Sequence, residues 1–303
     1  MARVAAIDCG TNSIRLLIAD IDGDTLTDVD RRLEIVRLGQ GVDRTGRLAP
    51  EAIERTRIAL AEYAAACKDI DRVRMVATSA TRDAANREEF HAMVRKTLGR
   101  DAEIITGDEE AALSYAGAVR SLTSARPPAL VLDIGGGSTE FVLGDGVKAT
   151  AQRSVNIGCV RLTERHLHDD PPTTQQVAAA EADVIAALTE VRSSVPVERA
   201  ASLIGVAGTV TTIAAIAENL PEYDADRIHG TVMDAATVHA ISDRLLAMPR
   251  AARAALPVMH PGRVDVIGAG ALILRVIVDG LGADAVITSE HDILDGIAWS
   301  LAT

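Results

Sequence analysis

The sequence has few cysteines, few aromatic residues and no long apolar run. Its three cysteines lie far apart among 303 residues, and they form neither a disulfide framework nor a pair with metal-ligand spacing. No apolar stretch reaches the roughly 18 residues that a membrane-spanning helix needs. The first residues also lack the basic and apolar regions of a signal peptide. We therefore expect a cytoplasmic protein that does not enter a membrane.

Basic residues are outnumbered as well. Lys and Arg total 31 against 43 Asp and Glu, which gives a net charge of −12, and aromatic residues make up 2%. Proteins that bind nucleic acids usually combine a basic surface with aromatic stacking platforms. Nucleic acid is therefore excluded as the expected partner. A polyanionic ligand would have to be held by a few local donors and a metal ion, against an unfavourable overall field.

Short apolar runs alternate with helical patterns along the chain, which predicts an α/β fold. At roughly 150 residues per domain, the length suggests two domains. The turn-forming segment 121–128 is the candidate boundary, so we expect domains at 1–124 and 125–303, with the last helix, about 290–303, packing back on the first domain. Among the predicted helices, one has Asp108 as its N-cap and runs to Val119.

An internal repeat links the two halves of the chain. The segments 8–15 and 133–140 each carry a polar, glycine-containing loop between two apolar strands, and a hairpin signal follows each. Such a repeat indicates a duplicated supersecondary unit. The alternative is a pair of unrelated hairpins, because Gly and Asp are common in turns. The residues at identical offsets are Asp8 and Asp133, Gly10 and Gly135, and Ser13 and Ser138.

The residue types in these loops suit phosphate and a divalent cation. Successive backbone N–H groups of a tight loop form a concavity that binds anions, and the run Gly135–Gly137 lacks the Cβ atoms that would keep a phosphate away. Asp8, Asp133 and Glu140 offer hard oxygen ligands for Mg²⁺. Two such loops facing each other would hold a polyphosphate group from both sides.

The two loops resemble the phosphate-binding hairpins of the sugar kinase/actin/Hsp70 superfamily, and the chain is similar to the exopolyphosphatase/guanosine pentaphosphate phosphohydrolase (Ppx/GppA) family within it. The resemblance implies two ribonuclease H-like, actin-like domains with an interdomain cleft, a Mg²⁺ or Mn²⁺ cofactor and a homodimer. The matching stretches are 7–13, 77–82, 105–111, 131–140, 156–160 and 205–212.

The same resemblance assigns roles to individual residues. It implies that Glu110 activates the attacking water and that Arg82 reaches the transferred phosphoryl group. Without it, Glu110 would be a first-turn residue that complements the helix dipole, and Arg82 a surface ion-pair partner. Metal contact is implied for Asp133 and Glu140. Phosphate contacts are implied for Gly10, Thr11, Asn12, Ser13, Gly135, Gly136, Gly137 and Ser138, while Gly208 and Thr209 either form a third anion site at a helix start or pack that helix on a strand.

The expected activity is release of terminal phosphate from inorganic polyphosphate. Short chains should be preferred, because the net charge is negative and because longer family members continue into a further region that is absent here. Three alternatives remain open: a guanosine pentaphosphate phosphohydrolase, a sugar-kinase-like phosphotransferase and a polyphosphate or nucleotide sensor without turnover. Tyr115 and Tyr223 are the residues that could stack on a guanine.

Overall fold

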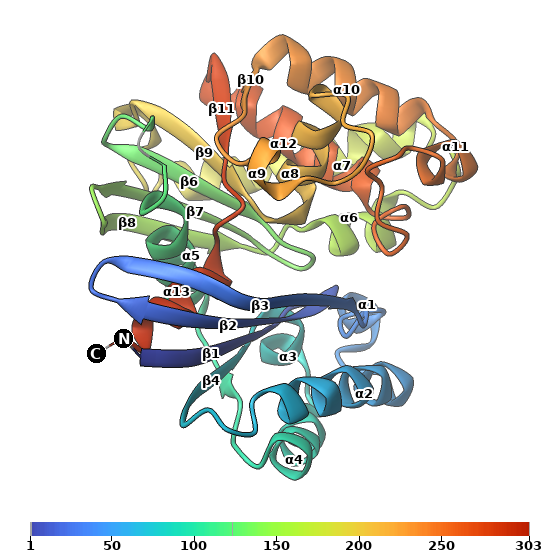
Figure 1. Ribbon diagram of the computed structural model, residues 1–303. Coiled ribbons are helices and arrows are strands. Elements are labelled where there is room, and N and C mark those ends of the chain that lie inside the picture. Colours follow the sequence, from blue (N-terminus) through green and yellow to red (C-terminus); the bar gives the residue numbers. More distant parts are fainter. Residues whose placement is uncertain (1, 123, 303) are drawn as a thin grey trace. The chain divides into compact units, whose positions relative to one another are not determined.

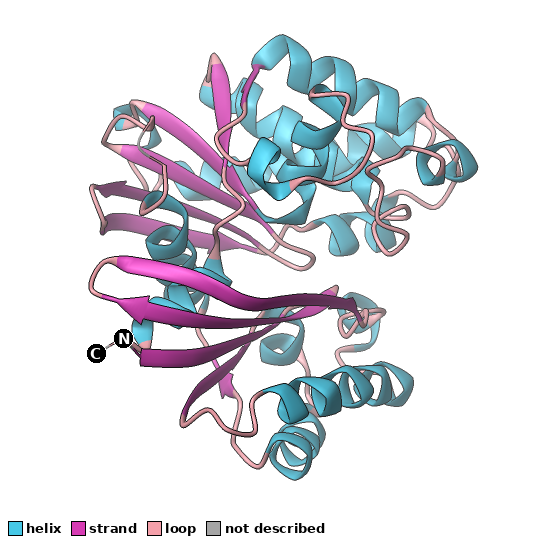
Figure 2. Cartoon of the chain, viewed as in Figure 1, coloured by secondary structure: helices cyan, strands magenta, loops and turns pink. Residues whose placement is uncertain are grey.

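The structure is a computed structural model that describes residues 2–122 and 124–302. Thr123, within the predicted boundary segment 121–128, lies outside the described residues, as do Met1 and Thr303. The chain forms two compact units, one made of Met1–Gly117 with Ile293–Thr303 and the other of Ala118–Asp292. Each unit combines one sheet with helices (Figure 2), which confirms the α/β class.

Unit 1 is built on a five-stranded sheet in the order β3-β2-β1-β4-β5 (Figure 1). Its first three strands form an antiparallel meander, and the last two run parallel to β1. The strands are β1 (Ala2–Cys9), β2 (Ser13–Asp22), β3 (Thr25–Ile35), β4 (Arg72–Ala77) and β5 (Glu103–Ile104). The helices are α1 (Val42–Thr45), α2 (Pro50–Ala66), α3 (Ser79–Asp83), α4 (Arg87–Leu98), α5 (Gly107–Val119), which ends beyond the unit's boundary, and α13 (Ile293–Ser300).

Alternation along β1 sends its side chains to two separate cores. Ala5, Ile7 and Cys9 pack in the cluster that contains residues of α2 and α4. Val4 and Ala6 pack on the opposite face, in the cluster that contains residues of α13. Asp8 shares the parity of Val4 and Ala6, so the end of β1 presents its carboxylate on the face that α13 covers.

Unit 2 repeats this topology on a six-stranded sheet. Its order, β10-β11-β9-β6-β7-β8, contains a three-stranded antiparallel meander followed by two strands parallel to the first, and β10 is added at the edge. The strands are β6 (Ala129–Ile134), β7 (Thr139–Asp145), β8 (Lys148–Val155), β9 (Ser202–Val206), β10 (Val232–Asp234) and β11 (Ala285–Thr288). The helices are α6 (Cys159–His166), α7 (Thr174–Arg192), α8 (Ala207–Ala217), α9 (Ala225–Ile228), α10 (Ala235–Ala247), α11 (Arg250–Ala254), α12 (Ile267–Leu281) and the 3₁₀ helix η1 (Val197–Arg199).

The core of unit 2 lies on one face of its sheet. Leu130, Leu132 and Ile134 of β6 pack against apolar residues of α7, α8, α10 and α12. Asp133 is turned to the other face by the same alternation. Within residues 2–122 and 124–302, no helix is both long enough and apolar enough to cross a bilayer.

The predicted N-cap of α5, Asp108, is wrong. The helix begins at Gly107, and Asp108 lies in its first turn instead of preceding it. The hydroxyl of Thr106 accepts a hydrogen bond from the backbone N–H of Glu109 at 3.1 Å, so Thr106 satisfies a donor of the helix start. Both Thr and Asp favour this position, and the sequence pattern did not separate them. The correction moves Glu110 two residues deeper, from the second to the fourth residue of the helix.

Candidate active site

The two predicted loops close with the same backbone hydrogen bond. The N–H of Gly10 donates to the carbonyl of Ser13 over 2.9 Å, and the N–H of Gly135 donates to the carbonyl of Ser138 over 3.0 Å. The flanking strands are also in equivalent register, since Asp8 lies opposite Arg15 and Asp133 lies opposite Glu140. The internal repeat is therefore confirmed as a duplicated hairpin, and the alternative of unrelated turns is excluded.

The first loop is held from behind by the segment that follows β3. The N–H of Gly39 donates to the carbonyl of Thr11 at 2.8 Å, and the N–H groups of Val36 and Arg37 donate to the carbonyl of Asn12. A Cβ on Gly39 would lie 2.3 Å from a methyl carbon of Thr11, so only glycine permits this approach. The Thr11 hydroxyl is buried and hydrogen-bonded to the hydroxyl of Ser79 at 2.9 Å. The shape of the loop is therefore fixed before any ligand binds.

Arg82 and Glu110, the two predicted catalytic residues, are in direct contact. Arg82 lies on α3, and its Nη1 donates to Oε2 of Glu110 at 3.0 Å and to the carbonyl of Ile105 at 3.0 Å. The Glu110 side chain is 10% exposed and that of Arg82 is 24% exposed. The arginine therefore holds one carboxylate oxygen of Glu110 in place, within a site that is shielded but open to solvent.

Asp8, a predicted metal ligand, is paired with an arginine from the adjacent strand. Both Nε and Nη2 of Arg15 donate to Oδ2 of Asp8, at 3.0 and 2.7 Å. The strand register explains the pair, because residues directly opposite in an antiparallel ladder share a face. Arg15 thus belongs to the immediate surroundings of the first loop.

Asp133 and Glu140 place two carboxylates side by side in unit 2. They are opposite each other in the β6–β7 register and both are buried, and Ser154 Oγ donates to Oε1 of Glu140 at 2.6 Å. Like charges directly opposite in a ladder are destabilising unless a cation offsets them. Mg²⁺ is commonly held by one or two carboxylates together with substrate phosphates. The pair fits this mode, whereas no group of three or more potential ligand side chains occurs in the part of the chain that the structure describes.

The second loop is supported by the start of α6. The N–H groups of Cys159 and Val160 donate to the carbonyls of Gly135 and Gly136 at 3.0 and 2.9 Å, and Nε of Arg161 donates to the carbonyl of Gly137 at 2.7 Å. A Cβ on Gly158 would lie 2.5 Å from the backbone of Gly136. The stretch 156–160 therefore shapes the glycine loop from behind.

Arg263, which was not predicted from the sequence, lies at the predicted anion site of Gly208 and Thr209. Arg263 lies against Gly208, where an added Cβ would be 2.2 Å from Nη2, and its Nη1 donates to the hydroxyl of Thr212 at 3.1 Å. Thr209 is buried against Gly270 of α12. Gly208 thus makes room for a guanidinium at the start of α8. One signal existed in the sequence, a basic residue just before a strongly apolar helix, where acidic residues are more usual.

The cysteines do not supply a nucleophile. Burial raises the pKa of the Cys9 thiol strongly, and the neighbouring Asp8 carboxylate raises it further. Burial also raises the pKa of Cys159 to about 11, although Arg263 acts in the opposite direction. A reactive thiol needs a lowered pKa, so the surroundings of Cys9 and Cys159 disfavour a nucleophilic role.

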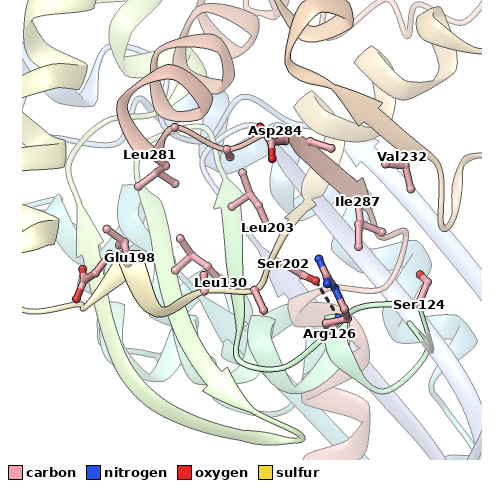
Figure 3. Close-up of a pocket in the computed structure, with 16 residues that line it drawn as sticks. Ser124, Arg126, Leu130, Glu198, Ser202, Leu203, Val232, Leu281, Asp284 and Ile287 are labelled. Carbon is pink, nitrogen blue, oxygen red and sulfur yellow. Dashed lines mark hydrogen bonds between the residues drawn. The ribbon is translucent and has the colours of Figure 1, made fainter.

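Unit 2 also contains a hollow of about 530 Å³. Figure 3 shows it lined by Arg126, Leu130, Ser202 and Ile287, among others, and the N–H of Arg126 donates to Ser202 Oγ at 2.8 Å. Leu130 and Ser202 stand at the beginning of β6 and β9, whereas the glycine loop follows the end of β6. Within unit 2, the hollow therefore lies at the opposite end of β6 from the glycine loop.

Known proteins resemble the chain over nearly its whole length. Residues 17–303 match the Ppx/GppA phosphatase family. The chain is 53% identical to Exopolyphosphatase 2 of Mycobacterium tuberculosis, with 100% of this chain and 99% of that protein covered. A crystal structure of an exopolyphosphatase-like protein is 43% identical with a TM-score of 0.95, covering 98% of both chains. The Aquifex aeolicus family member is 34% identical with a TM-score of 0.83, covering 99% of this chain and 97% of that one.

Proposed function

The chain belongs to the Ppx/GppA phosphatase family, and on that premise we propose that it is an exopolyphosphatase that releases terminal orthophosphate from inorganic polyphosphate. Two of its relatives carry the names exopolyphosphatase and exopolyphosphatase-like protein. The observation within this chain that carries the proposal is the contact between Arg82 and Glu110 at the start of α5. It joins a carboxylate that can accept a proton to a guanidinium that can bind phosphate oxygens.

In the proposed reaction, Glu110 acts on the attacking water and Arg82 acts on the transferred phosphoryl group. Glu110 orients a water and accepts its proton as the water oxygen attacks the terminal phosphorus. The bond between that phosphorus and the bridging oxygen breaks, and the shortened polyphosphate leaves with the bridging electrons. Arg82 offsets the negative charge that develops on the transferred phosphoryl group. Backbone N–H groups of loop 10–13 hold neighbouring phosphates. In unit 2, the loop 135–138 and Arg263 at the start of α8 offer phosphate donors of their own.

A divalent cation, Mg²⁺ or Mn²⁺, would be held by Asp133 and Glu140. Asp8, the third residue that the sequence predicts as a ligand, pairs with Arg15 inside unit 1. Bound there, it would neutralise charge on phosphate oxygens. Activity should be lost in a chelator and return with added Mg²⁺. Asp133→Asn and Glu140→Gln should each raise the Mg²⁺ concentration needed for half-maximal activity. An unchanged Mg²⁺ requirement in both variants would count against this pair as the ligands.

Guanosine pentaphosphate is the second candidate substrate, and Tyr223 favours it. The phenol oxygen of Tyr223 donates to Thr211 Oγ1 or Glu290 Oε1, at 2.7 and 2.6 Å, while the whole residue is 41% exposed. A ring with an anchored hydroxyl and an exposed face can stack on a base. Tyr115, the other aromatic candidate, is buried and cannot do so. Tyr223→Leu should weaken guanosine pentaphosphate hydrolysis while leaving polyphosphate hydrolysis intact.

A phosphate-release screen tests the proposal against its alternatives. Purified protein is given polyphosphates of defined length, guanosine pentaphosphate, and labelled ATP with and without sugars, and Glu110→Gln serves as the inactive reference. Polyphosphate should be the best substrate. Phosphate transferred from ATP to a sugar would indicate a kinase, and no turnover above the reference would indicate a sensor. Light scattering of the same preparation tests the homodimer that the family resemblance implies.

A further inference from the structure

The C-terminal helix touches the backbone of the helix that carries Glu110. Gly296 of α13 lies so close to α5 that a Cβ on it would stand 1.9 Å from the carbonyl oxygen of Leu113 and 2.7 Å from its carbonyl carbon. Real Cβ atoms essentially never come within 3.0 Å of another group. The obstacle is main chain, so no side-chain rotation can relieve it. Gly296 is therefore required for the present separation of the two helices.

A second contact ties the same two helices to the sheet. Arg74 of β4 donates from Nη2 to Glu109 in the first turn of α5 at 2.7 Å, and from Nη1 to Ser300 Oγ in α13 at 2.9 Å. The Arg74 side chain is only 16% exposed, and it also pairs with Glu103. Arg74 thus links Glu109, the residue before Glu110, to Ser300 at the end of α13.

We propose that Gly296 is a positioning residue for Glu110, setting the place of its carboxylate through the backbone of α5. The inference rests on the proposed role of Glu110. Leu113 follows Glu110 by three residues, and residues at this spacing lie one above the other on a helix face. Because the first turn is held by Thr106 and Arg74, a push at Leu113 would tilt α5 and carry Glu110 out of line with Arg82.

The geometry also gives the expected size of the loss in turnover when Gly296 is replaced by alanine. An added Cβ would need more than an ångström of movement from α5, and misplacing a catalytic group by about 1 Å can cost about 100-fold in rate. The three atoms nearest to that Cβ all belong to Leu113, and none belongs to the phosphate loop 10–13 of the same unit. Gly296→Ala should therefore lower kcat about 100-fold and change KM less than about threefold.

The experiment combines steady-state kinetics with a double-mutant cycle. Gly296→Ala is measured alone and together with Glu110→Gln, and residual turnover of each is compared. If Gly296 acts through Glu110, adding Gly296→Ala to Glu110→Gln produces no further loss. If it has only a structural role, the second substitution lowers residual turnover by its full factor, and the proposal is overturned. A Gly296→Ala protein that is folded and has normal kcat also overturns it.

Two further variants complete the test. Gly268→Ala is the matched control, since this helical glycine has only ordinary contacts at 3.6 Å or more and should keep full activity. Arg74→Gln loosens the second contact without adding a group against the backbone of α5, and it replaces Gly296→Ala if that protein does not fold. Its kcat should also fall, again without further loss in the Glu110→Gln background, and unchanged kcat would contradict the proposal. A fully active Glu110→Gln variant would instead remove the proposed base, whatever the result at Gly296.

Discussion

Arg82 donates to Glu110 with only one of its two terminal nitrogens. Nη1 bonds both Oε2 of Glu110 and the carbonyl of Ile105, on either side of the Thr106 cap. Nη2 and Nε of Arg82 make no hydrogen bond to any described residue. One end of the guanidinium therefore fixes the proposed base, and the other remains available to a phosphate oxygen.

Glu110→Gln should abolish most turnover without unfolding the protein. Glutamine has nearly the same shape and can still bond Arg82, but it cannot accept the proton of the attacking water. General-base groups contribute about 10²- to 10⁴-fold, so we expect kcat to fall by a factor in that range. Single-turnover phosphate release measures it, with circular dichroism as the check on folding. Wild-type kcat in this variant would contradict the assignment of the base.

Arg82→Lys should be a severe change despite the retained charge. Lysine has a single nitrogen and no planar fork, so it cannot present one nitrogen to Glu110 and another to a phosphoryl group. We expect kcat/KM for polyphosphate to fall roughly 100-fold, as for the loss of a donor to developing charge. The matched control is Arg57→Lys, because Arg57 forms an exposed ion pair with Glu54 on α2 and should tolerate the change. Equal, small effects at both positions would refute the role of Arg82.

Gly208→Ala should displace Arg263 without destabilising unit 2. The nearest atoms to the added methyl group would be the guanidinium of Arg263, the mobile end of a long side chain. We expect normal thermal unfolding, but KM for polyphosphate should rise several-fold because the cation at the start of α8 has moved. Arg263→Ala should produce the same rise, and the double variant should show no further increase. Additive effects would mean that Gly208 and Arg263 act separately.

Much of this site could be predicted from the sequence because it depends on local repetition. The spacing of Gly10 and Ser13 recurs at Gly135 and Ser138, and each pair closes the same turn, so comparing the two segments was enough. The apolar run before the first loop likewise predicted a strand, and the structure forms β1 there. Such features depend on residues a few positions apart, where hydrophobic period and turn chemistry determine the structure.

Contacts between distant segments were not predictable in the same way. Nothing near Gly208 indicates that Arg263 covers it, and nothing near Glu110 indicates that Gly296 packs behind its helix. The cap of α5 shows a second limit, since Thr106 and Asp108 suit the same role and tertiary packing selects one of them. Sequence patterns and the family resemblance predicted which residues belong in the site. The partners that orient those residues depend on how whole helices and sheets pack together.

Thiol reagents should have little effect on the native enzyme near neutral pH. Burial raises the pKa of Cys67 and of Cys159 from 9.0 to about 11, and burial raises that of Cys9 further. Since the thiolate is the reactive form, labelling at pH 8 should be about 100-fold slower than for an ordinary thiol with the same access. Ellman's reagent should detect three thiols in urea and almost none without it. Rapid labelling of the folded protein at pH 8 would contradict the buried placement.

The same pKa shifts give the sign of the alkaline stability change. A folded-state pKa that is raised means that the neutral thiol is favoured in the native protein. Its stabilising contribution is therefore present below pH 9 and is lost as the pH rises from about 9 towards 11. Urea unfolding at pH 8 and pH 10 should show a lower free energy of unfolding at pH 10. A smaller drop is expected in Cys67→Ala, because that variant lacks one of the titrating groups.

Short polyphosphate chains should be better substrates than long ones. Each added phosphate brings roughly one negative charge that needs a nearby cation or N–H donor, while the protein carries a net charge of −12. Several exposed arginines are already paired with carboxylates, so their positive charge is not free to bind distal phosphates. The pairs are Arg3 with Asp20, Arg57 with Glu54, Arg95 with Asp101 and Arg250 with Asp265. Distal phosphates should therefore add little affinity.

The enzyme should accordingly release a long chain between successive cuts. We expect higher kcat/KM on chains of a few to tens of phosphates than on chains of hundreds, with intermediates of all lengths visible on a gel. Because the repulsion is electrostatic and is screened beyond about 8–10 Å at physiological salt, raising the salt concentration should lower KM for long chains more than for short ones. Processive digestion without intermediates, with tighter binding of long polymer at low salt, would instead reveal a basic path along the protein that outweighs its net charge.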